Sequence, residues 1–103
     1  MKKDIFNYFT DSVLRLFELT TEELCRKIKG KEVVDARQLL WYLCSTRMEV
    51  VYIQKFTAEL GYECNHTTIL YGIKRVKNKM NEDADMRLIV SRIIQDSKHK
   101  QTL

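Results

Sequence analysis

The sequence predicts an all-α fold of about six helices, and its 103 residues are enough for one domain, residues 1–103. Proline is absent and only three glycines occur, so few positions interrupt a helix. Apolar residues recur at steps of three and four along most of the chain. The one β-rich patch, Val50 to Ile53, continues into Phe56 and Leu60 at helical spacing, which favours a helix there as well.

Two helices are expected before Gly30. The first covers about residues 3–17 and carries an apolar stripe at helical spacing. The stripe consists of Ile5, Phe6, Phe9, Val13, Leu16 and Phe17. Thr20 and Glu23 have the spacing of a capping box, which predicts the start of a short second helix that turns Leu24 and Ile28 inward and stops at Gly30.

The third helix, at about residues 32–46, is amphipathic in the same way. Its expected core side is Val33, Ala36, Leu40, Leu43 and Cys44, and its expected outer surface carries Lys31, Asp35, Arg37 and Gln38. Trp41 and Tyr42 lie beside core leucines, so we interpret them as core or core-edge aromatics rather than as a stacking platform.

Three further helices follow. The fourth, about residues 50–60, ends at Gly61, and Asn65 is a good N-cap for a fifth that reaches about residue 80. The last covers about residues 82–97, with residues 98–103 as a flexible tail. The predicted core positions are Ile53, Phe56 and Leu60, then Ile69, Ile73, Val76 and Met80, then Met86, Ile89, Val90 and Ile93.

The fourth and fifth helices have the spacing of a helix-turn-helix at about residues 50–80. In that motif the second helix enters the major groove of DNA with its N-terminus first, where free N–H groups favour phosphate and exposed side chains reach base edges. The residues so placed are Asn65, His66, Thr67 and Thr68, and the polar face continues with Tyr71, Lys74, Arg75, Lys77 and Asn78. An ordinary pair of antiparallel helices is the alternative interpretation.

The net charge of +4 is unevenly distributed. Residues 26–55 hold seven Lys or Arg against three acids, and residues 66–80 hold four against none. Two basic blocks are what a surface facing a polyanion would show if folding brings them together. Solvated helix faces would have the same composition.

Several classes of protein are excluded. No apolar run approaches the roughly 18 residues of a membrane span and no signal peptide is present, so we expect a cytoplasmic chain that does not enter membranes. Cys25, Cys44 and Cys64 form no C-x-x-C pair, and Cys64 with His66 supplies too few ligands for zinc. Neither histidine has a nucleophile at a recognisable spacing. We therefore expect no metal, no cofactor and no enzymatic activity.

Two separated motifs resemble a known family. The stretch Val33 to Leu43, V-V-D-A-R-Q-L-L-W-Y-L, and the stretch Asn65 to Val76, N-H-T-T-I-L-Y-G-I-K-R-V, are similar to the signature of the C-terminal DNA-binding domain (domain IV) of the bacterial replication initiator DnaA. That family follows approximately V-x-A-R-Q-x-x-x-Y-L and then D-H-[ST]-T-V-x-H-A-x-x-K-I. The segment from Val13 to Leu24 is also similar, so the resemblance covers roughly residues 10–80. It implies a Trp-repressor-like helix-turn-helix fold.

The resemblance also implies which residues contact DNA. His66, Thr67 and Thr68 would touch bases and phosphates in the major groove, and Lys29 falls where the family places an arginine in the minor groove. Arg37 and Gln38 fall on the A-R-Q stretch, whose side chains approach the DNA backbone. The expected interface is completed by phosphate contacts from Lys27 and Lys31 and by Asn65, Tyr71, Lys74 and Arg75 on the recognition helix.

Some positions depart from the family pattern. Asn65 replaces an aspartate, which keeps an N-cap but removes an acceptor for a cytosine amino group. The turn from Tyr62 to Cys64 is one residue longer than the Gly-Arg turn of the family and brings in the acidic Glu63. Lysine at position 29 lacks the planar fork of arginine. The standard initiator box is therefore not implied as the target.

We predict a protein that binds double-stranded DNA sequence-specifically, in replication initiation or its regulation, with other replication proteins as further partners. No G-x-x-x-x-G-K-[ST] motif occurs, so no nucleotide is expected to bind. The size predicts a free-standing copy of the domain from a phage, a mobile element or an accessory regulator. The alternative is a protein-interaction domain on the same scaffold that has lost specific DNA recognition.

Overall fold

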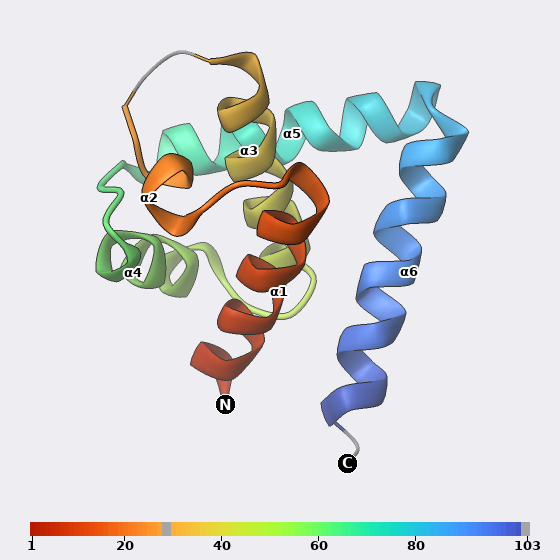
Figure 1. The fold of residues 1–103 in the computed structure, drawn as a ribbon, viewed down its shortest axis with the longest axis horizontal. Coiled ribbons are helices and arrows are strands. Elements are labelled where there is room, and N and C mark those ends of the chain that lie inside the picture. The colour runs from red at the N-terminus through yellow and green to blue at the C-terminus, as the bar shows by residue number, and fades with distance from the viewer. Residues whose placement is uncertain (28–29, 102–103) are drawn as a thin grey trace.

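Helix α3 (Lys31–Ser45) runs through the middle of the molecule, and α1, α2, α4 and α5 all pack against it (Figure 1). The computed structural model describes residues 1–27 and 30–101. Within them the chain forms six helices and no strand, which confirms the predicted all-α fold. The other helices are α1 (Lys2–Phe17), α2 (Thr21–Leu24), α4 (Val50–Leu60), α5 (His66–Glu82) and α6 (Ala84–Gln101).

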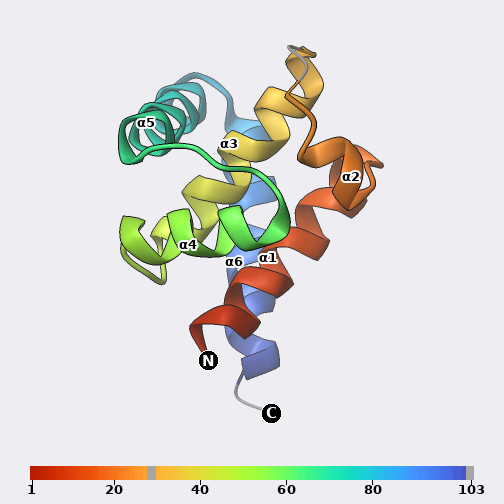
Figure 2. The same ribbon diagram turned by 90° about the vertical axis from the view of Figure 1, so that its left-hand side faces the viewer.

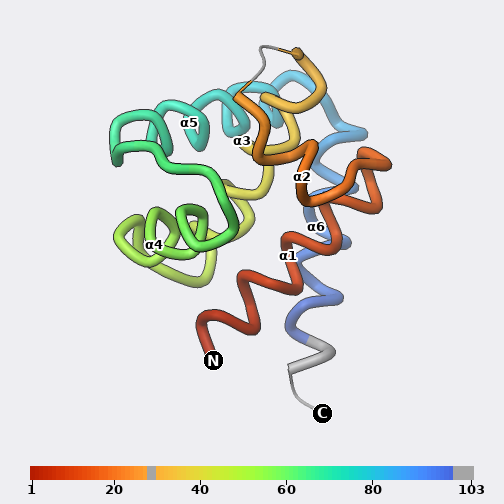
Figure 3. The backbone as a smooth tube through the Cα atoms, turned by 60° about the vertical axis from the view of Figure 1, so that its left-hand side comes forward, coloured from red at the N-terminus to blue at the C-terminus, as the bar shows by residue number. Residues whose placement is uncertain are grey.

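The arrangement of the helices leaves the first residues of α5 exposed to solvent. α1 and α4 pack on α3 and on each other (Figure 2), and α5 packs against α3 more extensively than any other pair of helices does. α6 turns back after α5 and runs beside α1 (Figure 3), in the direction of the end of the molecule where α1 starts. Along the described chain, no helix combines the length and the apolar character that a membrane span needs.

Most predicted core positions are buried. The stripe on α1 is confirmed at Ile5, Phe6, Phe9 and Val13, and the rings of Phe6 and Phe56 lie 5.5 Å apart between centroids. The predicted burial of Leu16 and Ile89 is wrong, since their side chains are 44% and 42% exposed. Both line an open groove between α1 and α6, because the two helices do not close over each other there.

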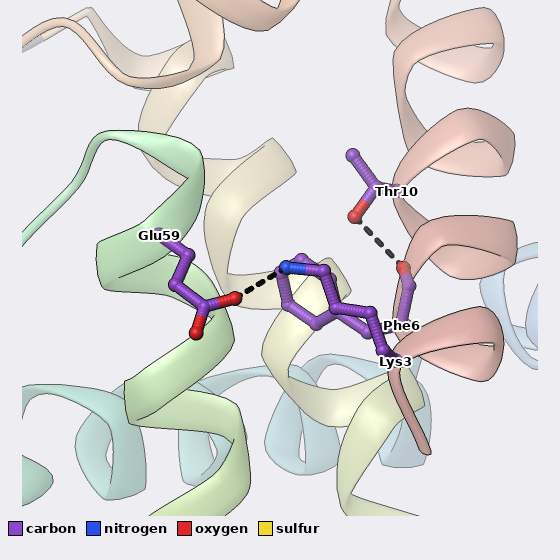
Figure 4. Close-up of polar contacts among 4 residues, drawn as sticks. All are labelled: Lys3, Phe6, Thr10 and Glu59. Carbon is purple, nitrogen blue, oxygen red and sulfur yellow. Dashed lines mark hydrogen bonds and ion pairs between the residues drawn. The ribbon is translucent and has the colours of Figure 1, made fainter. Parts of the chain in front are cut away.

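A polar contact joins α1 to α4 at the surface. Lys3 Nζ lies 2.6 Å from Glu59 Oε1, and this hydrogen bond holds the pKa of the Glu59 carboxyl below its usual value (Figure 4). The same ammonium group lies 5.0 Å from the centroid of the Phe56 ring. One turn further along α1, the Thr10 hydroxyl donates to the Phe6 carbonyl at 2.8 Å. Lys3 therefore ties the first turn of α1 to the last turn of α4.

The capping box that predicted the start of α2 is confirmed. The Glu23 N–H donates to Thr20 Oγ1 at 3.1 Å, and the Thr20 N–H donates to Glu23 Oε1 at 2.9 Å. These bonds favour the carboxylate form, so they lower the pKa of Glu23.

Two helix ends differ from the prediction. α2 ends at Leu24 rather than at Gly30, and Gly30 instead precedes α3 as its N-cap. The inward position predicted for Ile28 lies outside the described residues. α6 continues to Gln101, beyond the expected end at residue 97.

Candidate nucleic-acid interface

The turn between α4 and α5 is held by backbone and side-chain contacts. Gly61 ends α4 with φ of 128°, a conformation that glycine adopts without a Cβ clash. The Tyr62 N–H then donates to the Thr57 carbonyl at 3.0 Å. Gln54 on α4 donates through Nε2 to the Cys64 carbonyl at 2.8 Å, directly before α5 begins. The position of α5 relative to α4 is therefore defined by specific bonds.

Asn65 is the N-cap of α5, as predicted. Its Oδ1 accepts both from the Thr68 N–H at 2.9 Å and from the Thr68 hydroxyl at 3.0 Å. Because Oδ1 is used in this way, the exposed Asn65 side chain has its NH₂ group left to offer to a ligand. His66 and Thr67 are exposed beside it, with N–H groups of the first helical turn that no carbonyl of the helix can accept.

The outward face of α5 continues with exposed polar side chains. Thr67, Tyr71 and Lys74 follow at steps of four and three residues, and Tyr71 is 61% exposed. Arg75, on the flank of this face, is half-buried. Lys79 takes no part in it, because its ammonium group lies 3.0 Å from Asp35 Oδ1 on α3.

A second basic segment lies between α2 and α3. Lys27 and Lys31 are exposed, while Lys29 lies outside the described residues. In Figure 1 the chain directly after α2 and the N-terminal end of α5 both lie on the left-hand side, and Lys27 lines the same hollow as Asn65 and Thr68. Folding therefore brings the two basic blocks of the sequence close to one another.

One open hollow joins the two segments, and we call it the shared hollow. Its lining comes from the segment after α2, from α3, from the turn and from the start of α5. The lining residues are Lys27, Val34, Arg37, Tyr62, Glu63, Cys64, Asn65 and Thr68. A cation and a helix N-terminus at one concave site favour an anion, although Glu63 adds a negative charge.

Arg37 and Gln38 are not where the sequence analysis placed them. Each is only 6% exposed, so the expectation that they lie at the outer surface of α3 is wrong. α3 is surrounded by α1, α2, α4 and α5 and has little outer surface at this level. Gln38 packs against Gly72 of α5, and its Oε1 has no hydrogen-bond partner among the residues that the structure describes.

Arg37 is bonded inward. Its Nη1 donates to the Leu24 carbonyl at 2.7 Å and to the Arg26 carbonyl at 2.9 Å. Its guanidinium carbon lies 4.3 Å from the centroid of the Tyr62 ring. The carbonyls at and just after the end of α2 thus accept hydrogen bonds from a side chain of α3, which satisfies backbone groups that the helix itself leaves without a donor.

The sequence analysis missed two residues that shape this surface. Gln54 donates a hydrogen bond to the last carbonyl of the turn, and the Tyr62 ring packs between Arg37 and Trp41. An aromatic residue directly after a helix-ending glycine, in a turn that departs from the family pattern, was the available signal for Tyr62. Nothing in the sequence singles out Gln54, because an interior glutamine on a helix is usually solvated.

The described residues show no arrangement that would hold a metal ion, since no three His, Cys, Asp or Glu side chains gather among them. Burial raises the pKa of the Cys25 and Cys64 thiols, which keeps both protonated at neutral pH. The surface offers hydrogen-bond donors, hydroxyls and positive charge.

The α4–turn–α5 geometry, with an exposed and capped second helix, defines a helix-turn-helix domain. Residues 8–76 match the family model described as the bacterial dnaA protein helix-turn-helix. This chain belongs to that family, and the resemblance found in the sequence is confirmed.

Similar curated proteins include chromosomal replication initiator proteins DnaA. The protein of Corynebacterium jeikeium (strain K411) is 35% identical over 71 residues, which is 69% of this chain and 12% of the relative. That of Porphyromonas gingivalis (strain W83) is 30% identical over 81 residues, which is 79% of this chain and 17% of the relative. The chain thus spans less than a fifth of the length of these relatives.

Proposed function

We propose that this chain binds double-stranded DNA sequence-specifically through α4 and α5, in replication initiation or its regulation. The observation that carries the proposal is the shared hollow, where Lys27 meets the N-terminal end of α5 beside Asn65 and Thr68. Lysine and free helical N–H groups favour phosphate, and the exposed side chains next to them favour base contacts. Family membership supports the same function.

In the proposed complex α5 enters the major groove with its N-terminus first. His66 and Thr67 face base edges, and the free N–H groups of the first helical turn face a phosphate. Thr68, whose N–H and hydroxyl both donate to Asn65 Oδ1, lies beside these groups at the DNA surface. The further backbone contacts come from Lys27, Lys29, Lys31, Tyr71, Lys74 and Arg75. Arg37 and Gln38 are buried in the free protein, and we place them behind the contact surface.

Asn65 gives the proposed interface a preference of its own. Its Oδ1 is already occupied by two bonds from Thr68, so its NH₂ group donates. Donors pair with acceptor atoms in the major groove, namely N7 and O6 of guanine, N7 of adenine or O4 of thymine. An aspartate at this position would instead accept from an amino group. We therefore expect a target that differs from that of relatives with aspartate here.

Selection of random duplexes with the purified protein tests the proposal. We expect enrichment of one sequence, whose affinity falls with salt at a logarithmic slope of about −4 to −6 for five or six neutralised phosphates. Thr67→Ala should relax the preference at one or two positions at a cost of about 1–3 kcal/mol. Ser91→Ala, on the exposed surface of α6, is the matched control and should leave the selected sequence unchanged. Equal binding to every duplex would refute the sequence-specific proposal.

Glu63 favours a second candidate, a protein-interaction domain. Its exposed carboxylate lines the shared hollow and would repel a phosphate. If this candidate holds, no duplex binds at low salt, and Glu63→Gln does not restore binding. If DNA binding holds, Glu63→Gln tightens binding at every salt concentration.

The cellular setting is also part of the proposal. The curated relatives are named as chromosomal replication initiators, so we place this chain at a bacterial or phage replication origin, in the cytoplasm and near other replication proteins. Capture of origin DNA with the chain by cross-linking in cells tests this setting. Cross-links spread evenly over the chromosome would contradict it.

A further inference from the structure

We propose that the contact between Arg37 and Tyr62 is a positioning device, which holds the basic segment after α2 at a set distance from the N-terminal end of α5. The inference rests on the proposed function, because these are the two segments that would contact DNA. It assigns Arg37 a role inside the protein and gives Tyr62 a role where the family pattern has none.

The first half of the device joins α3 to the basic segment. The Nη1 atom of Arg37 bridges the carbonyls of Leu24 and Arg26, at 2.7 and 2.9 Å. Both bonds involve a charged donor and lie in a buried or half-buried place, where such bonds are strong. They hold the backbone directly before Lys27.

The second half joins the same guanidinium to the turn. The Tyr62 ring lies 4.3 Å from the Arg37 guanidinium carbon and 6.0 Å from Lys27 Nζ. Its centroid is 6.3 Å from that of Trp41, which is buried in α3. The ring is therefore fixed by the core on one side and contacts two cations on the other.

The charge of Arg37 also acts on two neighbouring thiols. The positive charge of Arg37 opposes the rise in pKa that burial causes at Cys25, directly after α2. It acts in the same way at Cys64, directly before Asn65. One guanidinium thus lies close to the backbone of both segments.

The consequence is preorganisation. A duplex that contacts both segments does not have to order them relative to one another, so less entropy is lost on binding. If either the Arg37 hydrogen bonds or the contact with the Tyr62 ring is lost, the basic segment should move more freely relative to the turn. No group that contacts a phosphate is removed by such a change. This expectation separates a positioning role from the direct backbone contact that the family resemblance implies for Arg37.

Salt-dependent binding of two variants tests this distinction. Arg37→Met and Tyr62→Leu should each weaken binding to the selected duplex about tenfold and leave the logarithmic salt slope unchanged. The double variant should lose no more than either single one, because each change breaks the same device. A slope that falls by about one in Arg37→Met would overturn the proposal and show a phosphate contact. Additive losses in the double variant would overturn it as well.

Controls separate this role from simple destabilisation. Arg92→Met removes an exposed arginine from α6, far from the turn, and should change neither affinity nor slope. Tyr62→Phe keeps the ring face and should recover most of the affinity that Tyr62→Leu loses. Arg37→Lys keeps the charge but not the planar fork, so we expect it to remain defective if it folds. Full recovery by Arg37→Lys would contradict the geometry.

Hydrogen exchange tests the device without DNA, so its outcome is independent of the proposed function. In Tyr62→Leu the change lies in the turn, yet the amides of residues 25–27 should exchange faster than in the unmodified protein. Amides in the middle of α1 should be unaffected. Unchanged exchange at residues 25–27 would refute the coupling even if the chain binds DNA. Faster exchange without any DNA binding would refute only the proposed function.

Discussion

The backbone of Gly72 on α5 packs directly against the ring of Trp41 on α3. A Cβ atom built on Gly72 would lie 2.8 Å from Cε3 of the Trp41 ring and 2.9 Å from Cγ of Gln38. Trp41 is buried, and its indole N–H is bonded, so the ring cannot move aside freely. Helix α5 therefore packs directly on the ring of a core residue.

Gly72→Ala should destabilise the protein for this reason. Alanine in a helix interior gains up to about 1 kcal/mol over glycine, but overpacking a core costs about 1–3 kcal/mol. We expect a net loss of about 1 kcal/mol in the free energy of unfolding, the middle of the overpacking range less the helix gain, measured by denaturant titration. Asn78→Ala, at an exposed position of the same helix, is the control and should be neutral or stabilising. If Gly72→Ala proved as stable as the control, the close packing would be contradicted.

Thr57→Val should also destabilise the protein, although the side chain keeps its shape. The Trp41 indole N–H donates to Thr57 Oγ1 at 3.3 Å in a buried place. Valine leaves that donor without a partner, at a cost of about 1–3 kcal/mol. Thr10→Val is the matched control, because the Thr10 hydroxyl is buried too but donates only to the Phe6 carbonyl of its own helix. Equal losses in the two variants would show that the Trp41 bond contributes nothing.

The capping box predicts how stability responds to acid. The pKa of Glu23 is lowered in the folded state, so the folded protein favours the carboxylate more than the unfolded chain does. Its contribution is present above the unfolded pKa, which lies near 4.5, and is lost as the pH falls through the lower folded value. Glu23→Gln keeps a capping side chain and should reduce the change in unfolding free energy between pH 6 and pH 3. An unchanged pH dependence would argue against the box in solution.

Two lysines of α5 should respond differently to replacement. Lys74 is exposed on the outward face, whereas Lys79 is paired with Asp35. Lys74→Ala should reduce the salt slope of duplex binding by about one and leave the stability unchanged. Lys79→Ala should lower the stability by about 0.5–1 kcal/mol and leave the slope unchanged. If Lys79→Ala reduced the salt slope and Lys74→Ala reduced the stability, a different face of α5 would contact DNA.

Asn65→Asp should change the preferred sequence without loss of the fold. Aspartate caps a helix as well as asparagine does, so the melting temperature should hold. A carboxylate accepts instead of donating, so one selected base pair should change to one that presents an amino group, with discrimination of about 1–3 kcal/mol. An identical selected sequence would show that this side chain faces solvent in the complex.

The local elements were predictable because their signals act over a few residues. The capping box at Thr20, the glycine that ends α4 and the N-cap at Asn65 each concern one helix end, and each is confirmed. The exposure of Leu16 and Ile89 was not predictable in this way. Periodicity shows which side of a helix is apolar, but whether a neighbouring helix covers a given turn of that side depends on how α1 and α6 pack against each other.

The sequence by itself determined the helices, the helix-turn-helix and the family, because these depend on spacing along the chain. Only the tertiary structure decided that Arg37 points inward and that Lys27 shares a hollow with the start of α5. An arginine in an amphipathic helix is normally solvated, and this one is buried because α3 has helices on several sides and the end of α2 offers it two carbonyls. That arrangement depends on contacts between residues far apart in the chain.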